Sequence, residues 1–357
     1  MKRVLIIGGG VVGATIAYEL SKESQFEITV IDQSAPAQAS TGAALGILMG
    51  IISQKRKGRA WQLREASMRR YPTLLEELEA QTHDRIPQVQ GLINLCFSEA
   101  EMEKWQDLAT LRHQQGWNLE LWQVQKLQMA CPDLNTDNLV GAVYSPQDLQ
   151  VQPQPLTETL LKAAQQNGVH CQWGIEATGV SVRQGELRGE SYLIQTNQGN
   201  YETDILIVAA GLGSFPLTRQ LQKPITLRPV LGQAMRVRLP QSLQLPAVVT
   251  GDDVHLIPLG EQEYWVGATV EFPDQPVTTP IEAVWEKAVQ FCPALAEAET
   301  LSSWSGKRPR PEGQAAPVIE NLDGYENVIV ATGHYRNGVL LAPATAEQVK
   351  AMILSRE

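Results

Sequence analysis

The sequence predicts an α/β fold in which a parallel sheet is assembled from three chain segments and a smaller α+β domain with an antiparallel sheet packs over it. Three apolar strands that each end at glycine support this prediction, at residues 3–7, 204–211 and 327–333. Strands buried on both faces of a parallel sheet have such continuous apolar sequences. A chain of 357 residues is also long for a single hydrophobic core.

We expect two domains, and each combines segments that are distant in the sequence. Residues 1–84, 147–220 and 313–357 are predicted to form the first domain, which contains the three strand-to-glycine segments. Residues 85–146 and 221–312 are predicted to form the second, where alternating strands such as QAMRVRL (233–239) and YWVGATV (264–270) are separated by prolines.

The first 32 residues predict a compact βαβ unit. A strand at 3–7 leads into a glycine loop, residues 12–22 have the apolar spacing of a helix, and EITVI (27–31) forms the second strand. The same criteria predict further elements: helices near 59–81, 99–115, 156–166 and 342–355, and turns at 184–185 and 197–199.

The glycine loop GGGVVG (8–13) fits the GxGxxG pattern between a strand and a helix. Gly8 allows a tight turn, Gly10 lets the backbone approach a pyrophosphate, and Gly13 lets the helix pack closely on the strand. Asp32 lies 19 residues beyond Gly13, at the end of the second strand, where a carboxylate binds ribose hydroxyls. The unit is therefore predicted to be Rossmann-like and to bind an adenine dinucleotide.

Composition argues against other partners. The net charge of −10 is unfavourable for a protein that binds nucleic acid, because phosphate binding needs a basic field. No cluster of His, Cys, Asp or Glu has the spacing of a metal site, and no GxSxG motif indicates acyl transfer. The cysteines form no CxxC pair, and we expect reduced thiols in a cytoplasmic protein: Cys96, Cys131, Cys171 and Cys292.

An apolar stretch at 42–52 is followed by the basic residues Lys55, Arg56, Lys57 and Arg59. Its 11 residues are too few for a membrane-spanning helix, which needs about 20. Two interpretations remain: an anchor at a membrane interface, or a buried turn and helix followed by a solvated loop. We favour the second, and a membrane association is not expected.

The closing motif GHYRNGVLLAPAT (333–345), together with AAGLGSFP (209–216) and the glycine loop, resembles FAD-dependent amino-acid and amine oxidases of the D-amino-acid oxidase family. Within that family the resemblance is closest to glycine oxidases of thiamine biosynthesis, and it covers nearly the whole chain. It implies noncovalent FAD as the cofactor. The backbone around 333–340 would lie against the flavin ring, where glycine permits close approach.

The resemblance also implies which residues contact FAD. AQASTGAALGIL (37–48) resembles the segment beside the pyrophosphate and isoalloxazine, Val180 the residue that meets the adenine, and Gly211 a glycine near the pyrophosphate. The cofactor residues expected in this way or from the glycine loop are Gly8, Gly10, Val11, Val12, Gly13, Asp32, Gln33, Ser40, Thr41, Ala44, Leu45, Gly46, Val180, Ala210, Gly211, His334, Tyr335, Arg336, Asn337, Gly338, Val339 and Leu340.

WSGKRPRPEG (304–313) resembles the family segment whose arginine grips the substrate carboxylate, which places Arg308 in the site. A guanidinium can pair with a carboxylate through two parallel hydrogen bonds and so fix its direction. The alternative is a solvated basic cluster, to which we assign Lys307 and Arg310. Arg336 is the second cation expected at the flavin edge or the substrate.

Two positions depart from the glycine oxidase pattern. His255 stands where the family usually has tyrosine, and Val270 stands where a methionine is found. Both are expected to face the ligand, although His255 could equally pack within its strand. A histidine there could titrate near neutral pH.

These features predict oxidative deamination of glycine or another small amino acid or amine by hydride transfer to flavin N5, with Arg308, Arg336 and His255 at the site. Oxygen is the expected acceptor, giving hydrogen peroxide, a 2-oxo acid and ammonia. Two alternatives stay open: a dehydrogenase that passes electrons to a quinone, and a flavin-binding subunit without turnover. Self-association is also left open by the sequence.

Overall fold

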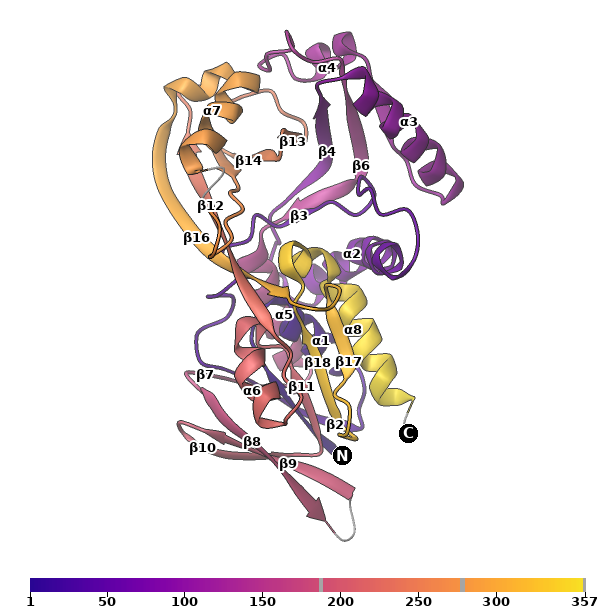
Figure 1. Ribbon diagram of the computed structural model, residues 1–357, viewed down its shortest axis with the longest axis vertical. Coiled ribbons are helices and arrows are strands. Elements are labelled where there is room, and N and C mark those ends of the chain that lie inside the picture. The colour runs from indigo at the N-terminus through magenta and orange to yellow at the C-terminus, as the bar shows by residue number, and fades with distance from the viewer. Residues whose placement is uncertain (186–188, 277–279, 356–357) are drawn as a thin grey trace.

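The computed structural model describes residues 1–185, 189–276 and 280–355, and its strands form three sheets with helices around them (Figure 1). The molecule is elongated, and a six-stranded sheet and a nine-stranded sheet occupy its two halves. The predicted α/β class is confirmed.

The six-stranded sheet unites three distant parts of the chain, in the order β17-β18-β11-β1-β2-β7. Its neighbouring strands are parallel except for β17, which pairs antiparallel with β18 at one edge. Its strands are β1 (Lys2–Ile7), β2 (Phe26–Asp32), β7 (His170–Trp173), β11 (Ile205–Val208), β17 (Val318–Asn321) and β18 (Val328–Thr332).

Alternating side chains of β1 enter different hydrophobic clusters, which explains why this strand is apolar throughout. Val4 and Ile6 pack in the cluster that contains α1, α2, α5 and α8. Leu5 and Ile7 pack in a second cluster with residues of a small three-stranded antiparallel sheet. That sheet comprises β8 (Ala177–Gly185), β9 (Gly189–Thr196) and β10 (Gly199–Thr203), and it projects at one end of the molecule (Figure 1). The parallel sheet is thus covered on both faces.

The nine-stranded sheet has the order β16-β12-β15-β14-β13-β4-β6-β3, with β5 also paired to β6. Among its described strands only β13 and β4 are parallel neighbours, so the expected antiparallel character is largely present. Its strands are β3 (Ile47–Leu48), β4 (Gln88–Cys96), β5 (Glu120–Trp122), β6 (Gly141–Val151), β12 (Leu227–Arg238), β13 (Val248–Gly251), β14 (Val254–Gly260), β15 (Glu263–Gly267) and β16 (Glu299–Pro311).

The helices pack around both sheets. The α1, α2, α5 and α8 helices pack together beside the six-stranded sheet, whereas α3, α4 and α7 lie around the nine-stranded sheet (Figure 1). The helices are α1 (Val11–Leu20), α2 (Arg59–Thr82), α3 (Glu99–Gln114), α4 (Val124–Ala130), α5 (Pro153–Gln166), α6 (Ser214–Gln220), α7 (Ile281–Phe291) and α8 (Gly338–Leu354).

Four elements differ from the sequence prediction. The 42–52 stretch contains the short strand β3 and a buried loop, not a helix. The α8 helix begins at Gly338 rather than near 342, with Pro343 in its interior. Long strands β4 and β6 occupy a region that had no clear periodicity. The turn predicted at 184–185 is not there, because β8 continues to Gly185, and the following residues 186–188 lie outside the described residues.

The strands divide almost as the predicted domain boundaries do. All six strands of the parallel sheet fall in the segments 1–84, 147–220 and 313–357. Strand β3 and the last residues of β6 belong to the nine-stranded sheet, although they lie within those segments. The division into two domains therefore stays a proposal, with the 47–48 and 147–151 stretches joining the second sheet.

The apolar part of the 42–52 stretch is buried, since Leu48, Ile51 and Ile52 have at most 1% of their surface exposed. The loop is held by two buried charged groups. The Asp148 carboxylate accepts hydrogen bonds from the backbone N–H groups of residues 50, 51 and 52, each at 2.8 Å. Arg112 donates to the carbonyls of residues 51, 53 and 55 at 2.7–2.8 Å. The buried turn and the solvated loop of the predicted interpretation are supported, because residues 54–59 are exposed, whereas its helix is absent from 42–52.

No helix among the described residues is long and apolar enough to cross a bilayer. The four cysteines are free thiols; three are buried and Cys171 is half-buried. Among the same residues, no group of three or more His, Cys, Asp or Glu side chains could hold a metal ion.

Candidate active site

The glycine loop closes tightly at the carboxyl end of β1. Gly8 has a φ of +123°, and a Cβ on Gly13 would lie 2.0 Å from the Gly8 carbonyl oxygen, so this turn requires glycine at both positions. The α1 helix begins at Val11, whose N–H donates to Thr41 Oγ1 at 3.1 Å. Within the described residues no hydrogen bond engages the N–H groups of Val12 and Gly13. They remain available for phosphate oxygens.

Asp32 ends β2 beside this loop. Its carboxylate accepts hydrogen bonds from the N–H of Gly9 at 2.7 Å and of Ser34 at 2.8 Å. These bonds fix the Asp32 carboxylate at the end of the strand. Each uses one lone pair of one oxygen, so the remaining lone pairs can accept hydrogen bonds from ribose hydroxyls. Gln33, the next candidate, is exposed.

The 40–46 segment joins the glycine loop to the long strand β16. Ser40 Oγ donates to the Lys307 carbonyl at 2.7 Å, and Trp304 Nε1 donates to the Ala43 carbonyl at 3.1 Å. Residues 44 and 45 are half-buried and Gly46 is buried. The 40–46 segment, predicted to contact the cofactor, is therefore in direct contact with β16, which carries the predicted substrate residue Arg308.

Two predicted residues, Gly211 and Val180 of β8, lie beside opposite ends of α6. Near its start, Gly211 has a φ of +55°, and its carbonyl accepts a hydrogen bond from Thr332 Oγ1 at 3.0 Å; Ala210 precedes it. Near its end, Gln220 Oε1 accepts the Val180 N–H at 3.0 Å. An adenine bonded to this N–H would have to replace the Gln220 carboxamide, which itself offers a donor and an acceptor as an adenine edge does.

The closing motif turns from β18 into α8. Gly333 and Tyr335 both have positive φ, +68° and +54°, so the chain reverses sharply before Asn337 and the first helical residue, Gly338. The side chain of His334 is directed into the helix, where Nε2 lies 2.9 Å from Thr345 Oγ1. Only its backbone can therefore meet a cofactor. Tyr71 of α2 donates to the Val339 carbonyl, and Leu340 is buried.

These residues fit FAD as a group. The glycine loop is a cradle that larger residues would fill, since a Cβ on Gly10 would lie 3.0 Å from Thr41 Oγ1. Free N–H groups at the start of α1 suit the pyrophosphate, and Asp32 suits the ribose. The positive-φ turn at 333–335 presents backbone in place of bulky side chains.

Arg308 of β16 is half-buried and held in a defined position. Its Nη1 donates to the Leu231 carbonyl at 2.9 Å. The guanidinium lies directly over Gly232 of β12, where a Cβ would be 2.2 Å from Nη2. Burial and the nearby charge of Arg336 lower the pKa of Arg308, whereas Lys307 and Arg310 are exposed, as predicted for the surface alternative. Gly232 was not foreseen from the sequence, because nothing in a glycine within a strand signals a neighbouring guanidinium.

His255 of β14 is buried, and its Nδ1 lies 2.9 Å from Thr250 Oγ1 on β13. Burial, together with the charges of Arg336 and Arg308, lowers the pKa of His255 to about 3. The structure thus brings the three predicted substrate residues together. The titration near neutral pH that the sequence suggested is not expected, because the imidazole stays neutral. Val270, which follows β15, is half-buried.

We therefore expect the Kd of a carboxylate inhibitor without an amine, such as acetate, to be constant between about pH 6 and 8. A histidine that gained a proton in this range would instead bind the anion more tightly as the pH falls. The flavin absorption spectrum reports the Kd, and His255→Tyr should give a parallel pH profile. Affinity that rises at lower pH in the wild type but not in His255→Tyr would contradict the buried, neutral imidazole.

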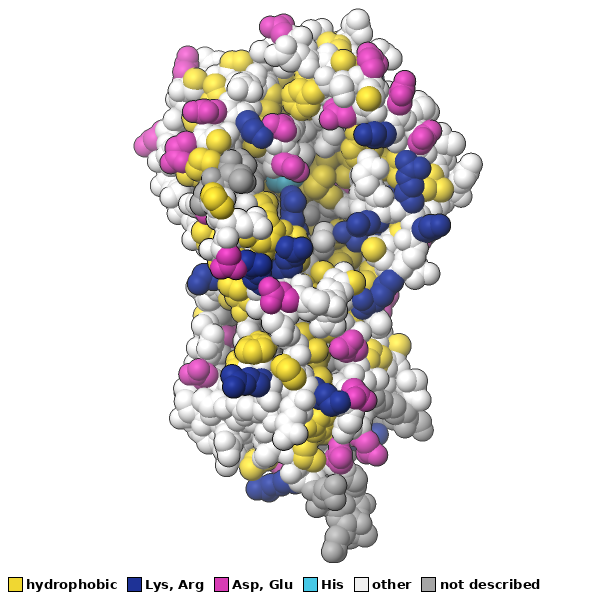
Figure 2. Space-filling model, viewed as in Figure 1, with side chains coloured by type: hydrophobic (Ala, Val, Ile, Leu, Met, Phe, Trp, Pro, Cys, Tyr) yellow, Lys and Arg dark blue, Asp and Glu magenta, His cyan; other side chains and the backbone are white. Residues whose placement is uncertain are grey.

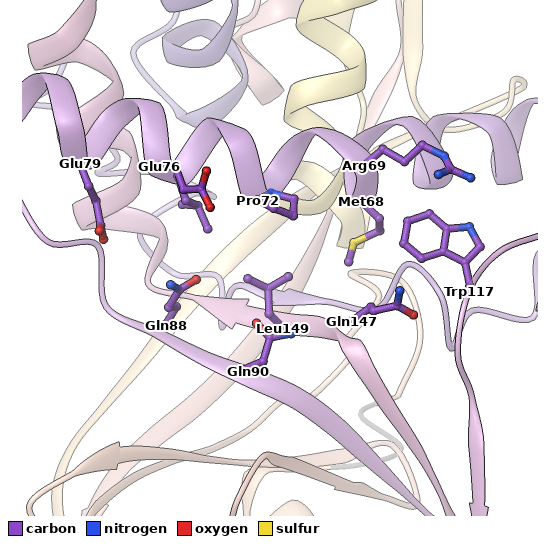
Figure 3. A pocket seen from close by; sticks show the side chains of 11 residues that line it. Met68, Arg69, Pro72, Glu76, Glu79, Gln88, Gln90, Trp117, Gln147 and Leu149 are labelled. Atoms are coloured by element: carbon purple, nitrogen blue, oxygen red, sulfur yellow. The ribbon is translucent and has the colours of Figure 1, made fainter.

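A separate pocket lies between α2 and the strands β4 and β6 (Figure 3). Met68 and Leu149 face each other across it, with Gln88, Gln90 and Gln147 along the strand side. None of the predicted cofactor or substrate residues lines this pocket.

Comparison with known proteins identifies relatives along the whole chain. Residues 3–352 match the family described as FAD dependent oxidoreductase (DAO). The chain is 32% identical to the bifunctional protein ThiO/ThiG of Synechocystis sp. over 99% of its own length but only 52% of that protein, so it spans about half the length of this relative. It is 28% identical to the glycine oxidase of Bacillus subtilis, covering 100% of this chain and 95% of that protein.

The crystal structure of glycine oxidase from Geobacillus kaustophilus superimposes with a TM-score of 0.87 at 26% identity, covering 100% of this chain and 96% of the other. This agreement confirms the predicted resemblance, the fold with its cofactor-binding and substrate parts, and FAD as the cofactor. The chain belongs to the family of FAD-dependent oxidoreductases.

Proposed function

We propose that this protein oxidises the amine of glycine or another small amino acid. The observation that carries the proposal is the half-buried Arg308 guanidinium, which is fixed by the Leu231 carbonyl and acts electrostatically, with Arg336, on His255. Within the described residues no carboxylate lies within 4.0 Å of Arg308. A cation of this kind is an anion-binding group, and an amino acid presents its carboxylate to such a group.

In this proposal each residue has a positioning role. Arg308 binds the substrate carboxylate through its free guanidinium nitrogens, and Arg336 adds a second positive charge near it. Neutral His255 can offer a hydrogen bond without a charge. Holding the carboxylate fixes where the α-carbon lies, and such positioning lowers the entropic cost of reaction. FAD bound in this cradle would supply the two-electron oxidising chemistry, with oxygen as the final acceptor.

The net reaction consumes the amino acid, oxygen and water, and yields a 2-oxo acid, ammonia and hydrogen peroxide. The carbon–nitrogen bond becomes an imine by loss of two electrons and two protons, and water then hydrolyses the imine. The cysteines, which are free thiols, also support our proposal of a reducing, cytoplasmic location.

Transfer of electrons to a quinone at a membrane receives no support from the 42–59 stretch. Its apolar residues Leu48, Ile51 and Ile52 are buried within the protein. The exposed part of the stretch is polar and basic, from Gln54 to Arg59.

Anaerobic addition of glycine to the yellow protein tests this function. We expect the flavin absorbance to bleach and to return on admission of air, with one hydrogen peroxide formed per flavin reoxidised. A panel of small amino acids and amines should be compared in the same assay. Bleaching that air does not reverse, but that a quinone does, would assign a different acceptor. A flavin that no amino acid or amine bleaches would refute the proposal.

A further inference from the structure

Basic side chains without an ion pair gather in two parts of the chain. Many lysines and arginines elsewhere have a carboxylate within 4.0 Å, in a protein whose net charge is −10. Within the described residues, no carboxylate lies within this distance of the basic groups of these two parts: Lys55, Arg56, Lys57 and Arg59; Lys307, Arg308, Arg310 and Arg336.

The fold brings the end of the first part close to the segment that carries Arg336. Arg59 Nη1 donates to the Pro317 carbonyl at 2.9 Å. Burial lowers the pKa of His334, and the charge of Arg59 lowers it further. Val318, the residue after Pro317, pairs with Thr332, which directly precedes the closing motif. Arg59, at the end of the 55–59 loop, therefore lies next to the start of the closing motif that carries Arg336.

This loop is anchored rather than loosely attached. Arg112, fully buried, donates to the carbonyls of Ser53 and Lys55 at 2.8 and 2.7 Å, and its guanidinium stacks over Trp61 at 3.5 Å. Asp148 holds the preceding three N–H groups. The backbone that carries the exposed side chains of residues 55–59 is thus held in a defined position.

Figure 2 shows the result on the surface. A hollow opens in the upper half of the molecule with a histidine side chain inside it, and Lys and Arg side chains gather around and below this hollow. An acidic side chain lies directly beside the histidine, and others lie among the basic side chains and toward the outer margins of the same half. The basic side chains gathered at the hollow attract anions and raise their local concentration.

We propose that the preferred substrate carries a second anionic group besides its α-carboxylate, as in an amino acid with a second carboxylate. This proposal rests on the proposed amino-acid oxidation. Arg308, with Arg336, suffices for one carboxylate, so the cations at 55–59 are available to the second group. The positive charges of the 55–59 loop would then increase the affinity for dianionic ligands more than that for monoanionic ligands.

The test compares monoanionic and dianionic inhibitors in the FAD-loaded protein. Kd values for acetate and for malonate, succinate and glutarate are read from the flavin spectrum at low ionic strength. We expect Arg56→Gln/Arg59→Gln to weaken binding of the best dianion by about three- to tenfold, and that of acetate by less than about twofold. The kcat/KM for aspartate relative to glycine should fall with it.

A matched control removes two positive charges elsewhere. Arg85→Gln/Lys104→Gln changes two exposed residues, between α2 and β4 and on α3, for which the described residues offer no ion pair. It should leave the ratio of dianion to monoanion affinity unchanged.

Four outcomes overturn the proposal: the loop variant leaves dianion affinity unchanged, it weakens both classes of inhibitor equally, it loses FAD, or the control lowers the ratio as much as the loop variant does. Arg308→Ala separates the two proposals, because unchanged acetate binding in that variant refutes the proposed function itself.

Discussion

Replacing Arg308 by alanine is expected to raise the Kd of acetate and the KM for amino acids by roughly 30-fold or more. Truncating one partner of a desolvated, hydrogen-bonded charge pair costs about 2–5 kcal/mol. Arg308 is fixed by the Leu231 carbonyl and is half-buried, so water compensates little for its loss. Stopped-flow reduction at several substrate concentrations and titration with acetate measure the two quantities.

Two further variants show whether position as well as charge matters. Arg308→Lys keeps the charge but loses the planar, two-pronged donor, and we expect it to recover only part of the affinity. Gly232→Ala does not alter the Arg308 side chain itself, but it puts a Cβ where the guanidinium lies and so displaces it. It should also weaken acetate binding, with an FAD spectrum like the wild type. Full acetate affinity in Arg308→Ala would mean that the site is elsewhere.

Replacing Asp148 by alanine is expected to lower the free energy of unfolding by about 3–5 kcal/mol. The substitution leaves three backbone N–H groups without their acceptor in a buried loop. Burial raises the pKa of Asp148 to about 6. The three N–H donors oppose this shift, because they stabilise the charged form. The carboxylate is therefore ionised at about pH 8, where urea denaturation should be followed by tryptophan fluorescence.

Asp148→Asn and Asp137→Ala serve as comparisons. Asp148 Oδ1 accepts two of the three bonds, so an asparagine can retain these two and lose the third, with a smaller loss of stability. Asp137 is exposed, and its removal should change the free energy of unfolding by less than about 0.5 kcal/mol. Equal stability of Asp148→Ala and the wild type would show that the loop does not depend on this carboxylate.

The glycine loop and the strands around it were predictable because their signals are local. A strand, a GxGxxG loop and an acid at the next strand end occur within 32 residues, and the fold is confirmed there. The α2, α3 and α5 helices were also predicted within a few residues of their ends. The start of α8 was not, since Pro343 inside the helix resembles a boundary.

Other features depend on contacts between distant residues and have no local signal. Asp148 and Arg112 lie 97 and 61 residues from Ile51, which both of them bind. The basic loop at 55–59 looked like an ordinary solvated segment, and the hydrogen bond from Arg59 to the carbonyl of residue 317 brings it close to the start of the closing motif. The lowered pKa of His255 also required the fold, because burial and two arginines from separate segments cause it.

The six-stranded sheet has a consequence for the order in which the protein can mature during synthesis. Strand β1 is made early, but its neighbour β11 is about two hundred residues later, and β18 and α8 follow later still. A nascent chain that ends before residue 328 presents the glycine loop with an open sheet edge and without the 333–340 turn. We therefore expect stable uptake of FAD only after the 328–354 segment has emerged from the ribosome, and until then β11 is an edge strand exposed to mispairing.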